Sequence, residues 1–356
     1  MKLRTIATAG FLATIAWTSH AQSSVTIYGV VDLGLTYISN NGGGSRKAMD
    51  SGAGRPSRLG FTGREDLGGG LAAIFTLESA FNFDTGAPRN AAAFFDRESS
   101  VGLSSTTWGT VKFGRMADFF SWELGVPDSA PFIQGGLAAG FQGFARPSGT
   151  PGAPPPVDVH YGPYQYNNSV KWVGKFGDVG AGLMYGLGSE NRQDKMMSAF
   201  VNYRSGPLSL GAGYTKDNFT TAVFAREVWG VRGMYVAGPV QLLANYAVGK
   251  DTTSQAKIRP LEIAVNYNIT PTVTLGGGYG YARATDSVGR TARITQPFVG
   301  TKYFLSKRTN LYAMAAFNKT SDKSIVPATV GVPGGATAAS TSDTMNAIRV
   351  GITHSF

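Results

Sequence analysis

The stretch Asn346-Ala347-Ile348-Arg349-Val350-Gly351-Ile352-Thr353-His354-Ser355-Phe356 ends the chain and decides its fold. Apolar and polar side chains alternate along it, with Ile348, Val350, Ile352 and Phe356 on one face and Arg349, Thr353 and Ser355 on the other. Because successive side chains of a strand point to opposite sides, this alternation predicts a strand with one apolar and one polar face. Such a strand fits either a soluble sandwich or a barrel in lipid.

Similar segments recur upstream, and the sequence predicts sixteen strands in total. They cover roughly 24–38, 57–66, 71–81, 95–104, 109–115, 168–176, 179–188, 196–204, 208–215, 227–237, 240–248, 259–269, 272–281, 293–305, 310–317 and 346–356. Short turns alternate with long polar, Gly-rich or Pro-rich linkers, so all the short turns fall at one end. This is the layout of bacterial outer-membrane barrels. We therefore expect an all-β fold, a sixteen-stranded antiparallel transmembrane β-barrel.

The aromatic residues distinguish this barrel from a sandwich. Many of them lie on apolar faces near segment ends, namely Tyr203, Tyr214, Trp229, Tyr235, Tyr246, Tyr267, Tyr279 and Tyr303. A barrel in lipid has girdles of aromatic residues at both membrane interfaces. A sandwich core would hold its large aromatics in the middle of its strands. The apolar faces are thus predicted to point outward and the polar faces to line water.

The ends and the composition narrow the class further. Residues 1–21 combine a basic start, an apolar run and small residues before Gln22, so we expect a cleaved export signal and a mature barrel over 22–356. The chain has no Cys, which excludes a disulfide framework. Its formal charge is +10, but the basic residues are scattered singly, and we expect no nucleic-acid partner.

Eight short sequence motifs, taken together, are characteristic of a known family. They are Ser24–Asp32, Ser57–Phe61, Glu65–Leu71, Val101–Ser104, Trp108–Arg115, Asn167–Val170, Leu305–Thr309 and Val350–Phe356. In this order they resemble the trimeric general porins of Gram-negative outer membranes, in their beta-proteobacterial branch. The resemblance implies a homotrimer in outer-membrane lipid that passes small hydrophilic solutes passively. It also implies that the barrel-assembly machinery reads the terminal Phe356.

The resemblance further implies that the third long loop folds into the barrel and narrows it. That loop is 116–167 here, far longer than an ordinary connector. Its aromatic residues, Phe119 and Phe120 among them, suit packing against the wall, whereas Asp118, Glu123 and Asp128 are expected to point into the channel. The Pro-rich tail from Pro147 to Pro156 favours a disordered surface loop instead.

Charges on the polar faces are the candidate selectivity residues, because only charges near the constriction act on a passing ion. Alternation along the strands places two sets of charged residues on the polar faces. The basic set is Arg58, Arg64, Lys112, Lys171, Lys175, Arg204, Arg232 and Arg349, and the smaller acidic set is Asp32, Glu78, Glu98 and Glu262. The candidate pore-lining residues are Arg58, Arg64, Arg97, Lys112, Arg115, Lys171, Asp118, Glu123, Asp128 and Gln165. Small anions are the expected solutes.

The resemblance implies an arginine cluster opposite the inward loop, and its first two positions match Arg58 and Arg97. The third falls near Gln165, so one expected charge is missing and the anion preference is expected to be weak. Simple alternation would put Arg97 on the face of Val101, so a bulge or the strand end has to turn it inward.

Other functions find little support in the residues. Of three His, His20 belongs to the leader, His160 to the Pro-rich tail and His354 to the apolar face of the last strand, which leaves no catalytic triad with an inward base. No spacing suits a metal, and we expect neither cofactor nor enzyme activity. The alternative is a structural or adhesive outer-membrane barrel with a plugged lumen.

Overall fold

The computed structural model describes residues 24–52, 54–120, 165–188, 195–218, 226–330 and 338–356. Its strands are β1 (Ser24–Asn41), β2 (Gly44–Ser51), β3 (Arg58–Gly68), β4 (Leu71–Asn82), β5 (Ala87–Pro88), β6 (Glu98–Ser105), β7 (Gly109–Ala117), β8 (Gln165–Phe176), β9 (Val179–Gly186), β10 (Met196–Ser205), β11 (Leu208–Asp217), β12 (Arg226–Ala237), β13 (Val240–Asp251), β14 (Lys257–Thr270), β15 (Val273–Thr285), β16 (Thr291–Phe304), β17 (Thr309–Thr320) and β18 (Thr344–Ser355). Among the described residues, no helix is long and apolar enough to cross a membrane.

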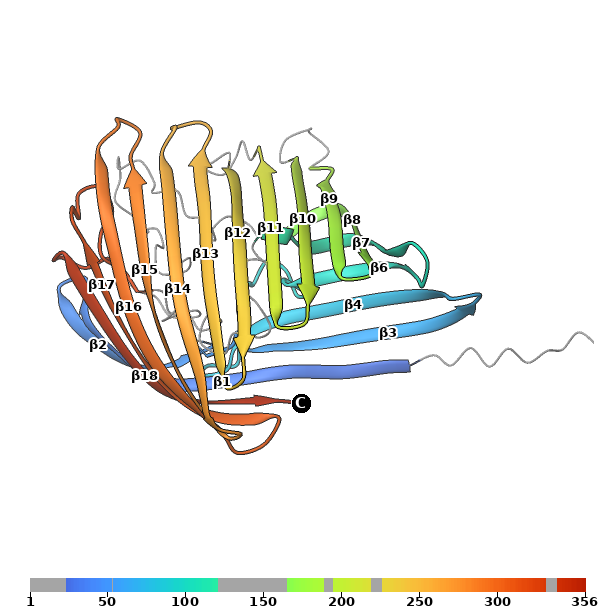
Figure 1. Cartoon of the computed structure of the whole chain (residues 1–356), viewed down its shortest axis with the longest axis horizontal. Helices are drawn as coiled ribbons and strands as arrows, with labels where there is room; N and C mark the ends of the chain where they lie inside the picture. Colours follow the sequence, from blue (N-terminus) through green and yellow to red (C-terminus); the bar gives the residue numbers. More distant parts are fainter. Residues whose placement is uncertain (1–23, 53, 121–164, 189–194, 219–225, 331–337) are drawn as a thin grey trace, which may run out of the picture.

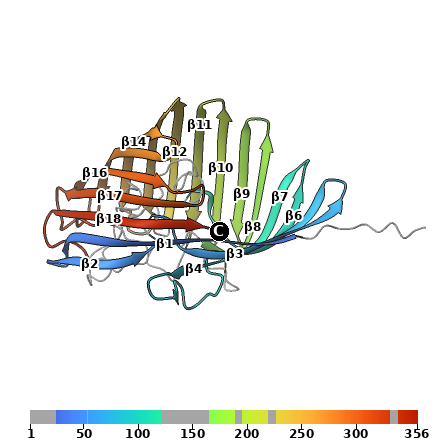
Figure 2. The ribbon, with the colours of Figure 1, turned by 90° about the horizontal axis from the view of Figure 1, so that it is seen from below.

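The strands form one antiparallel sheet that closes into a barrel, as Figures 1 and 2 show. Each strand pairs with its sequence neighbour, and β18 returns to pair with β1. The first part of β1 pairs with β3 and its second part with β2, so β2 and β3 share one position in the wall. The two-residue β5 pairs only with the end of β4. Eighteen strands therefore fill sixteen wall positions, and the predicted barrel is confirmed.

The strand β2 corrects the predicted loop over 39–56. Gly44–Ser51 forms a hairpin with the second part of β1 and ends at a bend before β3. Its side chains are mostly small or charged, so it has no apolar face that periodicity could detect. Its backbone pairing with β1, together with the ion pair between Arg46 and Asp50, holds it instead.

The predicted facing of the strands is confirmed in β18. Ile348, Val350 and Ile352 are 51%, 49% and 43% exposed on the outer face, whereas Arg349 is fully buried inside. The exposed aromatics Tyr203, Trp229, Tyr235, Tyr267, Tyr279 and Tyr303 lie on the same outer face as these apolar residues. This outer surface suits hydrocarbon with aromatic residues toward the interfaces.

Parts of two long loops pack against the inner side of the wall. Phe119 and Phe120, at the start of the third long loop, pack on inward side chains of Phe200 and Val228 respectively. The last long linker, between the predicted strands 310–317 and 346–356, also turns inward. Val326 is buried in a cluster with residues of β12–β16, and Val330 is buried in a cluster with residues of β1 and β16–β18. The described start of each loop therefore occupies space on the inner side of the wall.

The barrel closes at the chain terminus. Phe356 and Gly29 exchange two backbone hydrogen bonds of 3.1 Å, which extend the pairing between β18 and β1. The Phe356 ring lies over Gly29, where any Cβ would overlap it. Gly29 thus provides the slot into which the terminal ring fits.

We expect Phe356→Asp to slow assembly in the outer membrane, because it removes the ring from this slot and puts a charge on the lipid-facing side. Gly29→Val should act in the same direction by filling the slot. The folded fraction can be followed by the heat-dependent shift in electrophoretic mobility and by membrane fractionation. Gly44→Val, at the exposed start of β2, is the matched control, since a Cβ there meets open space. Normal assembly of Phe356→Asp would contradict the role given to the terminal residue.

Candidate functional site

Two arginines converge on one carboxylate inside the barrel. Glu78 on β4 lies 2.5 Å from Nε of Arg97 and 3.5 Å from Nε of Arg58, measured at its two carboxylate oxygens. The hydroxyl of Tyr28 donates to the same carboxylate at 2.9 Å. Two cations therefore lie against one carboxylate at this part of the inner wall.

Arg97 reaches this cluster because it precedes its strand. β6 begins at Glu98, and the backbone N–H of Arg97 donates to the carbonyl oxygen of Glu78 at 3.1 Å. The chain therefore turns onto β4 before the regular alternation starts, and the guanidinium is 5% exposed on the inner side. The strand end accounts for the departure from parity that the sequence indicated.

Two further cations extend this positive region. Arg55 lies in the bend between β2 and β3 and is close enough to act electrostatically on both Arg58 and Lys302. Lys302 lies on the inner face of β16. Neither was among the predicted site residues, although parity could have found Lys302. Arg55 could not be predicted as a site residue, because strand alternation does not indicate where a side chain in a bend points.

The predicted Lys112 and Lys171 face each other across β7 and β8. Lys112 Nζ lies 2.8 Å from Glu98 Oε1, so its charge is largely offset. Lys171 donates to the carbonyl oxygen of Ala117 at 2.9 Å and lies 4.2 Å from the centre of the Phe119 ring. This lysine therefore holds the start of the third loop against the wall.

Three other predicted residues lie on β3, β7 and β8. Arg64 is exposed near the short-turn end of β3, opposite Ser24. Arg115 donates to the backbone carbonyl of Asp96 at 2.7 Å and to Asn167 at 2.7 Å. Gln165 begins β8 opposite Ala117. Glu123 and Asp128 lie outside the described residues.

Asp118, predicted to point into the channel, is instead buried in a network around Arg226. Arg226 Nη2 lies 2.9 Å from Asp118 Oδ2, and Arg226 Nε lies 3.2 Å from Asp217 Oδ2. Tyr166 accepts from Arg226 at 2.9 Å and donates to Asp217 at 2.7 Å. The network ties both ends of the third loop, at Asp118 and Tyr166, to the ends of β11 and β12.

A second buried network crosses the closure between β1 and β18. Arg349 donates to Asp32 at 3.2 Å, to the Tyr312 hydroxyl at 2.8 Å and to the carbonyl oxygen of Asp50 at 2.7 Å. Both Arg349 and Asp32 are fully buried. These parity-predicted charges therefore stabilise the closed wall and do not face the water path.

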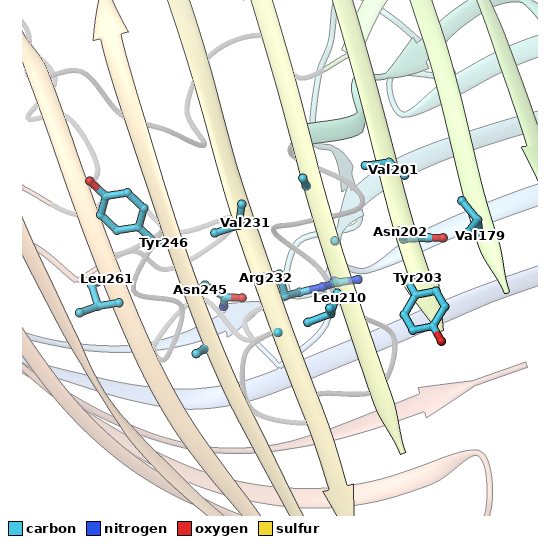
Figure 3. Close-up of a pocket in the computed structure, with 14 residues that line it drawn as sticks. Val179, Val201, Asn202, Tyr203, Leu210, Val231, Arg232, Asn245, Tyr246 and Leu261 are labelled. Atoms are coloured by element: carbon cyan, nitrogen blue, oxygen red, sulfur yellow. The ribbon is translucent and has the colours of Figure 1, made fainter. Parts of the chain in front are cut away.

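The outer face of β9–β14 has a shallow depression of about 530 Å³, drawn in Figure 3. Val201, Tyr203, Leu210 and Val231 surround it, and small residues such as Ala212 form its floor. Its surface is almost wholly apolar, which offers no anchor for a hydrophilic solute. It belongs to the face that meets hydrocarbon, not to the pore.

Side chains that bind metal ions are not grouped in the described part of the chain. Within those residues, no three His, Cys, Asp or Glu side chains are placed to hold a metal ion. His354 lies exposed on β18, with Nδ1 at 2.9 Å from the Thr309 hydroxyl.

Comparison with known proteins agrees with this geometry. Residues 7–323 match the family model described as Gram-negative porin. Outer membrane porin protein 32 of Delftia acidovorans is 30% identical, with 94% of this chain and 95% of that protein covered. The solved anion-selective porin from Comamonas acidovorans has a TM-score of 0.77 at 27% identity, covering 94% of this chain and all of that one. The trimer form of OmpT from Vibrio cholerae shares the fold, with a TM-score of 0.70 at 17% identity and coverage of 94% and 99%.

Proposed function

The chain belongs to the Gram-negative porin family and is an outer-membrane channel, and we propose that it conducts small hydrophilic solutes passively with a weak preference for anions. One observation supports an anion preference: Arg58 and Arg97 both contact the carboxylate of Glu78, with Arg55 nearby. Fixed positive charges along a narrow water path favour anions. The anion selectivity of the porin from Comamonas acidovorans supports the same sign.

Two features support a weak preference. Glu98 offsets Lys112, and Gln165 stands where the family resemblance implies a third arginine. Salt screens the remaining field over about 8 Å at physiological ionic strength, so only an ion close to the cluster responds to it. The cluster of Arg58 and Arg97, with Gln165 in place of the implied third arginine, is therefore the main source of selectivity in this proposal.

We infer the assembly from the family. The barrel is expected to form a homotrimer in outer-membrane lipid, with the leader 1–21 removed on export and Phe356 read by the barrel-assembly machinery. The trimer form of OmpT from Vibrio cholerae supports this state by fold only. The segment 116–167 is the proposed constriction loop, supported by the packing of Phe119 and Phe120 on the inner wall.

The zero-current potential in a potassium chloride gradient tests the selectivity. Wild type is expected to give a small potential of the anion-selective sign. Arg58→Ser should shift it toward cation preference, because Glu78 then offsets the charge of Arg97 alone. Gln165→Arg should shift it toward anions, and both shifts should shrink as salt is raised.

Arg308→Ser is the matched control, since Arg308 lies in an exposed short turn and should leave the potential unchanged. A clearly cation-selective wild type, or no shift in either variant, would remove these residues from the constriction. A folded barrel that carries no current would favour the plugged structural barrel instead.

A further inference from the structure

A second concavity, of about 660 Å³, lies at the short-turn end of the barrel. Its polar residues come from the inner faces of four adjacent strands: Gln241 on β13, Asn266 and Asn268 on β14, Thr274 on β15 and Lys302 on β16. This volume lies within the range of pockets that hold small ligands. By the layout of outer-membrane barrels, this is the periplasmic mouth of the channel.

The polar wall of the concavity is held in one arrangement by internal hydrogen bonds. The Thr274 hydroxyl donates to Asn268 Oδ1 at 2.7 Å, and Asn266 Nδ2 donates to Gln241 Oε1 at 2.9 Å. Each of these bonds uses an amide oxygen, while the Asn268 amino group keeps two N–H donors. The wall therefore offers donors to a ligand more than acceptors.

The charge of the residues that line the concavity also favours an anionic ligand. Lys302 is the charged member of the lining, and no acidic residue is among the described residues that line the concavity. Arg55 acts electrostatically on Lys302 and on Arg58, while Asp32 acts on Lys302 with the opposite sign, so Lys302 and the arginine cluster belong to one charged region of the inner wall. A cation with amide donors around it selects an anion, since hydrogen bonds to charged groups are the stronger ones.

The remaining lining restricts the anion. Phe304, Val236 and Val240 give the concavity an apolar side next to Lys302 and the amides. Inorganic phosphate or chloride would leave that side without contact, whereas an organic acid would cover it with its apolar body. We propose that this concavity is a binding subsite for small organic monocarboxylates, with the carboxylate at Lys302 and the apolar body against Phe304. This inference rests on the channel function proposed above.

Benzoate is a suitable probe, added to the full-length protein in a planar bilayer bathed in potassium chloride. We expect benzoate to reduce the chloride current in a saturable way. Lys302→Gln should raise the half-blocking concentration about tenfold, because it removes the charged donor. Phe304→Ala should raise the value for benzoate while leaving the value for acetate unchanged, since acetate has no body to reach the ring.

Lys175→Gln is the matched control. Lys175 lies at the same end of the barrel on β8, outside the concavity, and its loss should change the half-blocking concentration less than twofold. Benzyl alcohol and inorganic phosphate should block much less than benzoate. Equal block of wild type and Lys302→Gln, or an equal effect of Lys175→Gln, would overturn the subsite. A barrel without current would overturn the channel function, whereas a conducting barrel insensitive to benzoate would overturn only the subsite.

Discussion

Arg226→Leu is expected to raise the single-channel conductance and make it fluctuate, because this arginine holds both ends of the third loop. Its removal takes away the guanidinium that pairs with the buried carboxylates of Asp118 and Asp217. Breaking a buried ion pair from one side costs about 3–5 kcal/mol, enough to release the loop start from the wall. Conductance records in bilayers, together with protease sensitivity of the folded barrel, measure the effect.

Arg283→Leu is the matched control for this prediction. Arg283 is exposed near the last residue of β15, at the same end of the barrel as Arg226. Arg226→Lys should rescue the conductance in part, since it keeps the charge but not the two-sided geometry of the guanidinium. Unchanged conductance and protease resistance in Arg226→Leu would show that the third loop is held by other contacts.

Arg349→Leu is expected to destabilise the folded barrel by about 3–5 kcal/mol, because it leaves the buried Asp32 uncompensated between β1 and β18. The temperature at which the barrel loses its compact electrophoretic mobility should fall. The double variant Asp32→Leu with Arg349→Leu should recover part of the loss, since no unpaired charge remains. Arg308→Leu, in an exposed turn, provides the control. A single variant as heat-resistant as wild type would contradict the structural role of this network.

The sequence was sufficient to predict the wall, because a strand in lipid repeats its pattern every two residues over its whole length. Ile348, Val350 and Ile352 alternate with Arg349 for that reason, and the turn residues mark each short connection. The strand β2 was not predicted, because Gly44–Ser51 has no alternating apolar face. Backbone pairing to β1 defines it, and backbone groups are the same in every residue.

The site was less predictable than the wall. Asp118 and Arg226 are 108 positions apart, and no local pattern relates them. Arg97 was assigned by resemblance, and its contact with Glu78 follows from where β6 begins. Val326 and Val330 turn inward because the wall leaves an apolar surface for them, which exists only once β12–β18 and β1 are assembled. Parity tells which way a strand residue points, but it is silent on loops.

The closure between β1 and β18 also has a kinetic consequence. Thr353 and Asp32 touch across 321 positions of chain, so the contacts that seal the barrel are among the most non-local that this sequence can make. Contacts of high sequence separation form slowly. Until Phe356 arrives beside Gly29, the growing sheet has two open edges that can pair with other chains. A chain that lacks its last strand is therefore a source of aggregation, and release of the barrel as a finished unit has to wait for its final residue.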